Sequence, residues 1–265
     1  MAIPSQSKPL KMVSILIPVY NEATTLNQCL DNVLQQELPL GLAKEIIIVE
    51  SNSTDGSREL VKAFYEKSQE GRSSPQTEIK LILQECPQGK GFAIREALSQ
   101  ASGDIIIIQD ADLEYDVADY PELLRPILEG HAHFVLGSRH LSAGSWKVRQ
   151  FERGTFTANF MNIGAVFFHT FFNWLYGVEL TDPTTMYKVF RIECIQGIKF
   201  ECSRFDFDWE LVAKLIRLGF IPIEIPISYK SRGFSEGKKI SLTKDPLLWV
   251  RAIIKYRLTP IERTL

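Results

Sequence analysis

The stretch Ile105-Ile106-Ile107-Ile108-Gln109-Asp110-Ala111-Asp112 gives the strongest indication of the fold. Four consecutive β-branched residues predict a strand that is buried on both faces, as strands of parallel sheets are. Two carboxylates one residue apart at the end of that strand repel each other unless a cation lies between them. Oxygen ligands of this kind suit Mg²⁺ or Mn²⁺, which also bind substrate phosphates. The stretch therefore predicts a divalent metal site at the edge of a sheet.

Strands and helices alternate on both sides of this stretch in the first half of the chain. Apolar runs predict strands at residues 13–18, 45–49, 79–83, 104–108 and 133–136. Apolar residues at helical spacing predict helices at residues 22–36, 54–69, 91–100 and 120–128. This alternation indicates an α/β protein with a mainly parallel central sheet flanked by helices. Such sheets bind their ligands at the carboxyl ends of the strands.

The second half of the chain is less regular and richer in aromatic residues. We expect helix within residues 146–177, 209–218 and 246–258, and strands at 185–191 and 220–227. Residues 160–178 approach the length of a membrane span, which needs about 20 mostly apolar residues. Because Asn162, His169 and Asn173 interrupt this segment, we interpret it as one or two buried or interfacial helices.

Composition and missing motifs argue against several classes of protein. The net charge of -2 argues against a partner that is duplex nucleic acid. The four cysteines are widely spaced, which supports neither a zinc site nor a disulfide scaffold and favours a cytoplasmic protein. The first eleven residues lack an apolar signal core. The sequence also lacks the glycine motifs of dinucleotide enzymes and P-loop NTPases.

Polar residues follow four of the predicted strands. Residues 20–22 follow the first strand, Glu50 the second, Asp110 to Glu114 the fourth, and Gly137-Ser138-Arg139 the fifth. We expect these residues to meet at one edge of the sheet. Each alone could equally be a turn or a helix cap. Gly89-Lys90-Gly91, ahead of a predicted helix, could present N–H groups and a cation to phosphate, although it is also a common loop sequence.

Five motifs occur in the order seen in family 2 glycosyltransferases of the GT-A fold. They are Ser14–Glu22, Ser53–Ser57, Gly89–Arg95, Gln109–Glu114 and Gly137–Arg139. Residues 181–191 and 224–229 resemble the branch that contains dolichyl-phosphate mannose synthase and its bacterial polyprenyl-phosphate relatives. The resemblance implies a GT-A catalytic domain over residues 12–240. It leaves an N-terminal tail, residues 1–11, and a C-terminal basic amphipathic helix, residues 241–265.

Transferred residue by residue, the resemblance implies three sets of site residues. The implied donor-binding residues are Pro18, Tyr20, Asn21, Glu22, Glu50, Lys90, Arg95, Asp110, Ala111 and Asp112. The implied ligands of Mg²⁺ or Mn²⁺ are Asp110, Asp112 and Glu114. The implied acceptor-binding residues are Arg139, Arg149 or Arg153, Thr155, Arg232 and Lys238. Glu50-Ser51-Asn52-Ser53 departs from the family's usual Asp-Asp-Gly-Ser, so the donor stays open between UDP- and GDP-linked sugars.

The expected reaction is an inverting, metal-dependent hexosyl transfer, with Asp112 and Arg139 as catalytic residues. The expected acceptor is a polyprenyl phosphate such as dolichyl or undecaprenyl phosphate, which is already ionised. A hydroxyl acceptor would need a carboxylate base, for which Asp182 and Glu210 are candidates. Both acids could instead cap helices or pair with Arg191 or Arg217.

Two alternatives for the function stay open. One is a transferase that glycosylates a saccharide or another hydroxyl acceptor, and the other is an inactive nucleotide-binding protein. Aromatic residues within 160–176 and the basic amphipathic run 249–257 favour peripheral contact with the cytoplasmic face of a membrane. Ordinary core packing beside a solvated charged face would explain the same two segments.

Overall fold

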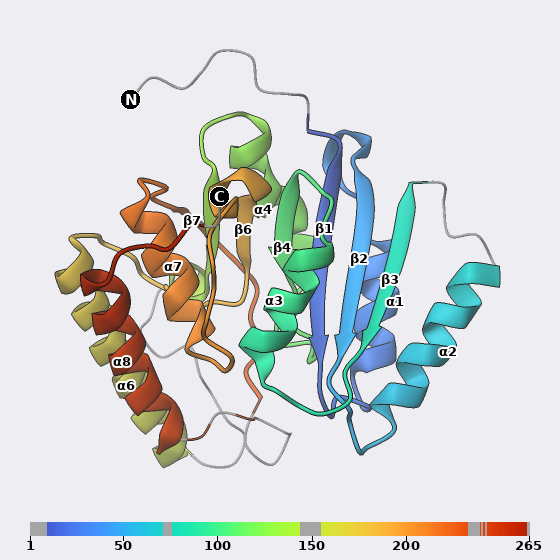
Figure 1. The fold of residues 1–265 in the computed structure, drawn as a ribbon, viewed down its shortest axis with the longest axis horizontal. Helices are drawn as coiled ribbons and strands as arrows, with labels where there is room; N and C mark the ends of the chain where they lie inside the picture. The colour runs from blue at the N-terminus through green and yellow to red at the C-terminus, as the bar shows by residue number, and fades with distance from the viewer. Residues whose placement is uncertain are drawn as a thin grey trace.

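The computed structural model describes residues 10–70, 76–143, 155–232, 239, 241 and 243–263, and only the backbone of residues 155–157. Most of the predicted tail, residues 1–9, therefore lies outside the described residues. Within them, strands form one sheet in the order β3-β2-β1-β4-β6-β5-β7 (Figure 1). The strands are β1 (Met12–Val19), β2 (Ala43–Glu50), β3 (Thr77–Leu83), β4 (Ile105–Ile108), β5 (Phe134–Ser138), β6 (Lys188–Arg191) and β7 (Ile223–Pro226).

The sheet is mainly parallel, as the alternating sequence pattern predicts. β1 pairs in parallel with β2 and with β4, and β5 pairs in parallel with β7. β6 is the exception, because it runs antiparallel between β4 and β5. The connection from β4 to β5 thus skips one position in the sheet, and a strand from the second half of the chain fills it. The second half of the chain therefore reaches the middle of the sheet beside the predicted metal-binding run.

Helices pack on the sheet, and two of them lie beside it at one edge. The helices are α1 (Leu26–Gln35), α2 (Ser57–Glu70), α3 (Lys90–Gln100), α4 (Tyr120–Leu128), α5 (Arg139–Ala143), α6 (Thr155–Tyr176), α7 (Phe207–Arg217) and α8 (Lys244–Leu258). Short 3₁₀ turns are η1 (Pro39–Gly41), η2 (Val117–Asp119) and η3 (Ile192–Ile195). In Figure 1, α3 and α7 lie in front of the sheet, and α6 and α8 form its left flank. The single helix α6 occupies the segment for which the sequence left one or two helices open.

The core explains why the isoleucine run forms a central strand. All four isoleucines of β4 are fully buried, and burying one such side chain stabilises the fold by about 1.5–3 kcal/mol. α7 is buried along Phe207–Ile216, because α8, α3 and α6 pack against it. Among the described residues, no helix is long and apolar enough to cross a membrane.

Candidate active site

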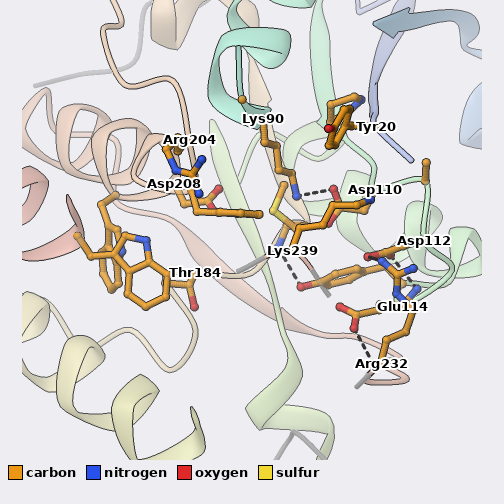
Figure 2. Close-up of a pocket in the computed structure, with 18 of the residues that line it drawn as sticks. Tyr20, Lys90, Asp110, Asp112, Glu114, Thr184, Arg204, Asp208, Arg232 and Lys239 are labelled. Carbon is orange, nitrogen blue, oxygen red and sulfur yellow. Dashed lines mark hydrogen bonds and ion pairs between the residues drawn. The ribbon is translucent and has the colours of Figure 1, made fainter. Parts of the chain in front are cut away.

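A cavity of about 750 Å³ lies at the carboxyl ends of β1 and β4. Its polar end contains Asp110 and Asp112, together with cationic groups from α3 and from the segment after β7 (Figure 2). Its other end is apolar and is formed by α6 and α8, with Phe168 and Trp249 among the lining residues. The predicted convergence of polar groups at one sheet edge is therefore present, and the cavity joins it to an aromatic wall.

Lys90 begins α3 and binds the first carboxylate of the pair. Its Nζ lies 2.5 Å from Oδ1 of Asp110. Burial alone would lower the pKa of Lys90, but the charges of Asp110 and Asp208 outweigh it and hold that pKa above its ordinary value. Lys90 is therefore a fixed cation at the end of β4, where a diphosphate would need one.

The glycines around Lys90 serve packing. A Cβ at Gly91 would lie 2.6 Å from Cβ of Phe207 and 2.8 Å from the carbonyl oxygen of Arg204, so only glycine fits there. Gly89 has φ +99°, a conformation that residues with a side chain rarely adopt. The α3 terminus is thus pressed against residues 202–207, a close backbone approach that the sequence analysis did not include.

Asp112 lies where negative charges crowd together. Burial raises the pKa of Asp112 to about 7, and the neighbouring charges of Asp110 and Glu114 raise it in the same direction. Arg232 opposes them, with Nη2 at 2.7 Å from Oδ2 of Asp112 and Nη1 at 2.8 Å from Oε2 of Glu22. Side chains of the same protein therefore supply cations beside carboxylates that were predicted to need one.

Glu114 faces the segment after β7. Its carboxylate accepts hydrogen bonds from the backbone N–H of Arg232 at 2.6 Å and from the Tyr229 hydroxyl at 3.2 Å. Among the described residues, Asp110, Asp112 and Glu114 do not form a group of three ligands within 4.8 Å of one another. Asp110, Asp112 and Glu114 all line the cavity, but the proposed role of Glu114 as third metal ligand would require the three carboxylates to move closer together.

The donor set at the polar end fits a hard divalent cation. Asp110 and Asp112 provide carboxylate oxygens two residues apart, and burial together with the charges of Asp110 and Glu114 raises the pKa of Asp112, an effect that a bound cation would oppose. Oxygen ligands without cysteine or histidine suit Mg²⁺ or Mn²⁺. The residues present are therefore compatible with the metal that the family resemblance implies.

Arg139 and Asp182 form a further ion pair, and both side chains are buried. Nε and Nη2 of Arg139 each lie 2.6 Å from one carboxylate oxygen of Asp182, and the backbone N–H of Arg139 adds a third hydrogen bond. Burial would raise the pKa of Asp182, but the Arg139 guanidinium holds it well below its usual range. A carboxylate so stabilised in its charged form is a weak base. The base role expected for Asp182 is therefore not supported.

Two histidines lie beside this ion pair. His140, His169 and Asp182 bring one potential ligand atom each within 4.8 Å of one another. Both oxygens of Asp182 already accept from Arg139, and Nε2 of His169 lies 3.1 Å from Oγ1 of Thr184. Because a guanidinium already neutralises the carboxylate, we interpret this group as a polar network beside the cavity.

Glu210 lies away from the cavity and binds backbone. Its carboxylate accepts from the N–H groups of Glu201 and Cys202, and Nζ of Lys214 lies 2.5 Å away. The side chain is fully buried and does not line the cavity. This position does not support the base role for Glu210. The alternative of ion pairing is correct in kind, but the partners are Arg139 for Asp182 and Lys214 for Glu210, instead of Arg191 or Arg217.

The remaining donor-side candidates divide into two groups. The cavity is lined by Pro18, Tyr20, Glu22, Lys90, Asp110, Ala111 and Asp112. Three others do not line it. Asn21 joins two loops, because its N–H donates to Ser53 and its Oδ1 accepts from Thr54. Glu50 accepts from Ser53 and Arg58, and Arg95 donates to the carbonyl of Phe200.

The acceptor-side candidates are only partly within the described residues. Arg139 and Arg232 line the cavity. Arg149, Arg153 and Lys238 lie outside the described residues, as does the side chain of Thr155, the first residue of α6.

Several cavity residues were missed by reasoning from the sequence. They are Thr184, His169, Asp208, Trp209 and Lys239. Asp208 pairs with Lys188 at 2.8 Å, and its signal was the alternation of acids in Asp206-Phe207-Asp208-Trp209-Glu210 at a helix start. Lys239 contacts Glu22, and only the geometry distinguishes it from its neighbour Lys238.

Carboxylates and cations at the end of a central strand, beside a cavity of about 750 Å³, agree with one family. The family model described as glycosyl transferase family 2 matches residues 14–187. The chain belongs to this family. A dolichol-phosphate mannosyltransferase of Pyrococcus furiosus is 26% identical over 229 residues, which are 85% of this chain and 59% of the relative. An undecaprenyl-phosphate 4-deoxy-4-formamido-L-arabinose transferase of Yersinia pestis is 37% identical over 127 residues, 48% of this chain and 37% of the relative.

Solved structures agree on the fold of this family 2 glycosyltransferase. A glucosyl-3-phosphoglycerate synthase from Mycobacterium tuberculosis, crystallised with Mn²⁺, uridine diphosphate and phosphoglyceric acid, has a TM-score of 0.64 at 18% identity. The match covers 95% of this chain and 80% of that one. The predicted GT-A fold is confirmed. The chain spans less than two thirds of the length of the two curated relatives above.

Proposed function

We propose that this family 2 glycosyltransferase moves a sugar from a nucleotide-diphosphate sugar to a polyprenyl phosphate at the cytoplasmic face of a membrane, with inversion at the anomeric carbon. One observation carries the proposal: a single cavity joins the carboxylate and cation cluster to a wall of aromatic and aliphatic side chains. The polar end suits a diphosphate, and the apolar end suits the chain of a lipid acceptor. The names of the two curated relatives support the same class of acceptor.

The donor would bind at the ends of β1 and β4. Tyr20 and Ser51 line the cavity where the nucleoside would lie, and Lys90 and Arg232 are the cations nearest the carboxylates. Both could stabilise negative charge on the departing diphosphate, which is the main task in this kind of transfer. The departure from Asp-Asp-Gly-Ser at Glu50–Ser53 leaves UDP and GDP as the two donor classes to test.

The proposed metal would be held by Asp110 and Asp112, with Glu114 as a further candidate. When bound, Mg²⁺ or Mn²⁺ would neutralise the diphosphate and polarise its bond to the sugar. Arg232 contacts Asp112 in this structure and would then be available to phosphate oxygens.

The acceptor would approach from the side of α6 and α8. A phosphate oxygen attacks the anomeric carbon from the face opposite the diphosphate, a new carbon–oxygen bond forms, and the bond to the diphosphate breaks. Because the acceptor phosphate is already ionised, this reaction needs positioning and no carboxylate base. That requirement agrees with an Asp182 carboxylate held by Arg139 and a Glu210 remote from the cavity.

A screen of donors against acceptors tests the proposal. UDP- and GDP-linked sugars would be incubated with polyprenyl phosphate in detergent, with and without Mn²⁺. The expected product is a lipid-linked sugar that forms only with metal and is cleaved by mild acid. Transfer to a saccharide hydroxyl, with none to lipid phosphate, would instead support the hydroxyl-acceptor alternative. A protein that binds no nucleotide diphosphate in Mn²⁺ would contradict both.

A further inference from the structure

α6 shows an arrangement of side chains that is unusual for a helix in water. Its 22 residues include no Asp, Glu, Lys or Arg. The side chains on its outer face are large and apolar, with Phe167 61% and Trp174 76% exposed, and Phe160, Ile163 and Val166 also exposed. A helix on a protein surface normally turns its charged residues outward. A contiguous exposed apolar face of this kind marks an interaction surface.

α8 lies against α6 and adds positive charge to the same flank. The Tyr176 hydroxyl donates to the carbonyl of Ile253 at 2.9 Å, and the rings of Phe168 and Trp249 are 5.2 Å apart. The exposed residues of α8 recur at helical spacing and are basic or apolar: Lys244, Leu247, Arg251, Ile254, Arg257 and Leu258. The one acid in α8, Asp245, is fully buried.

This surface is continuous with the cavity. Phe160 is exposed and also lines the cavity, so it lies at the rim. Gly164 and Ala165 of α6, with Pro246 and Trp249 of α8, extend the apolar wall inward from that rim. An apolar chain could therefore pass from the outer face of α6 to the polar end without crossing a charged surface.

We propose that the outer faces of α6 and α8 dock on the surface of an anionic lipid bilayer, so that the cavity takes its acceptor directly from the lipid leaflet. Apolar and aromatic residues beside basic residues are the chemistry that such a surface recognises, because the rings enter the headgroup region and the cations meet lipid phosphates. A second copy of the chain fits less well, since it would bring two basic stripes together. The entry of the acceptor rests on the proposed function, whereas the docking does not.

Binding to vesicles tests the docking without any substrate. The full chain would be sedimented with vesicles of phosphatidylcholine alone and of phosphatidylcholine mixed with phosphatidylglycerol. We expect binding to the mixed vesicles that weakens as salt is raised. The double variant Phe167→Glu with Trp174→Glu should bind them at least about tenfold more weakly, and Arg251→Gln about fivefold more weakly.

A matched control is Leu40→Glu. Leu40 is 85% exposed in η1, so the variant places one glutamate, where the double variant places two, on an exposed leucine outside α6 and α8. It should bind vesicles like the wild type, and thermal melting should show that all variants fold. Equal binding by the wild type and the double variant would overturn the inference. So would a wild type that stays in solution, or a dimer that the double variant converts to monomer without change in vesicle binding.

Transfer assays separate this inference from the proposed function. With a short prenyl phosphate dissolved in water, the double variant should keep wild-type turnover, because Phe167 and Trp174 do not line the cavity. With polyprenyl phosphate embedded in vesicles it should lose most of that turnover. If the wild type binds vesicles but transfers sugar to no prenyl phosphate, the docking stands and the proposed acceptor fails. If transfer from vesicles is equal in both proteins, the acceptor stands and the docking fails.

Discussion

Asp112 and Asp182 each meet an arginine near the same cavity, but the two pairs differ in kind. Asp182 is fully buried and receives Arg139 through both carboxylate oxygens. Asp112 meets Arg232 through one oxygen, beside two further acids that repel it. In the first pair, both carboxylate oxygens of Asp182 accept hydrogen bonds from Arg139, and the pair stabilises the fold. The second lies among three carboxylates that receive cations from the protein's own Lys90 and Arg232, an arrangement compatible with the proposed site for a metal and a diphosphate.

The strongest test of this difference is Asp112→Asn. Removing the charge while keeping the shape should lower metal-dependent transfer about a thousandfold, equal to about 4 kcal/mol in the barrier, and leave the fold intact. Turnover with Mn²⁺, Mn²⁺ affinity and thermal melting would be measured together. Asp116→Asn is the matched control, because Asp116 is exposed and caps η2, where asparagine also caps well. Unchanged turnover in the Asp112 variant would contradict the site assignment.

For the buried pair of Arg139 and Asp182 we expect the opposite pattern, in which a substitution lowers the free energy of unfolding before it affects turnover. Arg139→Ala leaves the Asp182 carboxylate buried without its cation, which should lower the free energy of unfolding by about 3 kcal/mol. It should also impair acceptor use more than donor binding. Arg125→Ala is the control, since the Arg125–Glu122 pair is more than half exposed and should contribute less than about 1 kcal/mol. Equal denaturation midpoints for the two variants, or equal acceptor affinity with and without Arg139, would be evidence against this role.

The smallest effect is a difference in pH dependence. The folded pKa of Asp112 is raised to about 7 without metal, so this group makes the folded state less stable as pH rises from about 4 to 7. The folded pKa of Asp182 is lowered, so its contribution is present above about pH 4 and is lost as pH falls toward the folded value. Each slope is at most about 1.4 kcal/mol per pH unit.

Denaturation of the metal-free protein across this range would measure both slopes. Asp112→Asn should remove the loss of stability between about pH 4 and 7, and Asp182→Asn should flatten the acid side below about pH 4. If either variant keeps the wild-type profile, the environment assigned to that acid is wrong.

The first half of the chain, which forms β1 to β4, was the more predictable part of the molecule. Val13–Pro18 and Asp104–Ile108 lie within a residue or two of β1 and β4, and most of the polar residues that follow them line the cavity. The physical reason is that a buried parallel strand needs an unbroken apolar run, and its carboxyl end marks the ligand side. Sequence spacing alone therefore placed Asp110 and Asp112.

The second half of the chain was less predictable, because the residues that it contributes to the cavity come from elements that meet only in three dimensions. Thr184, His169 and Asp208 belong to a loop and two helices, and no local pattern brings them together. The ion pairs could not be predicted from the sequence either, because the partners are far apart along the chain. Arg139 and Asp182 are 43 residues apart, and Arg232 and Glu22 are 210 residues apart. Strand β6 runs antiparallel to β4, and no periodicity within its four residues could indicate that direction.

The close approach that glycine permits at position 91 affects how α3 and α7 can move relative to each other. The N–H of Phe92 donates to the carbonyl of Ser203 at 3.0 Å, and Gly91 leaves no gap between α3 and the start of α7. Lys90 and Asp208 therefore belong to two helices, α3 and α7, whose N-terminal ends are in direct contact. This contact connects the two halves of the chain. We therefore expect Lys90 and Asp208 to move together, because the backbones that carry them are in direct contact.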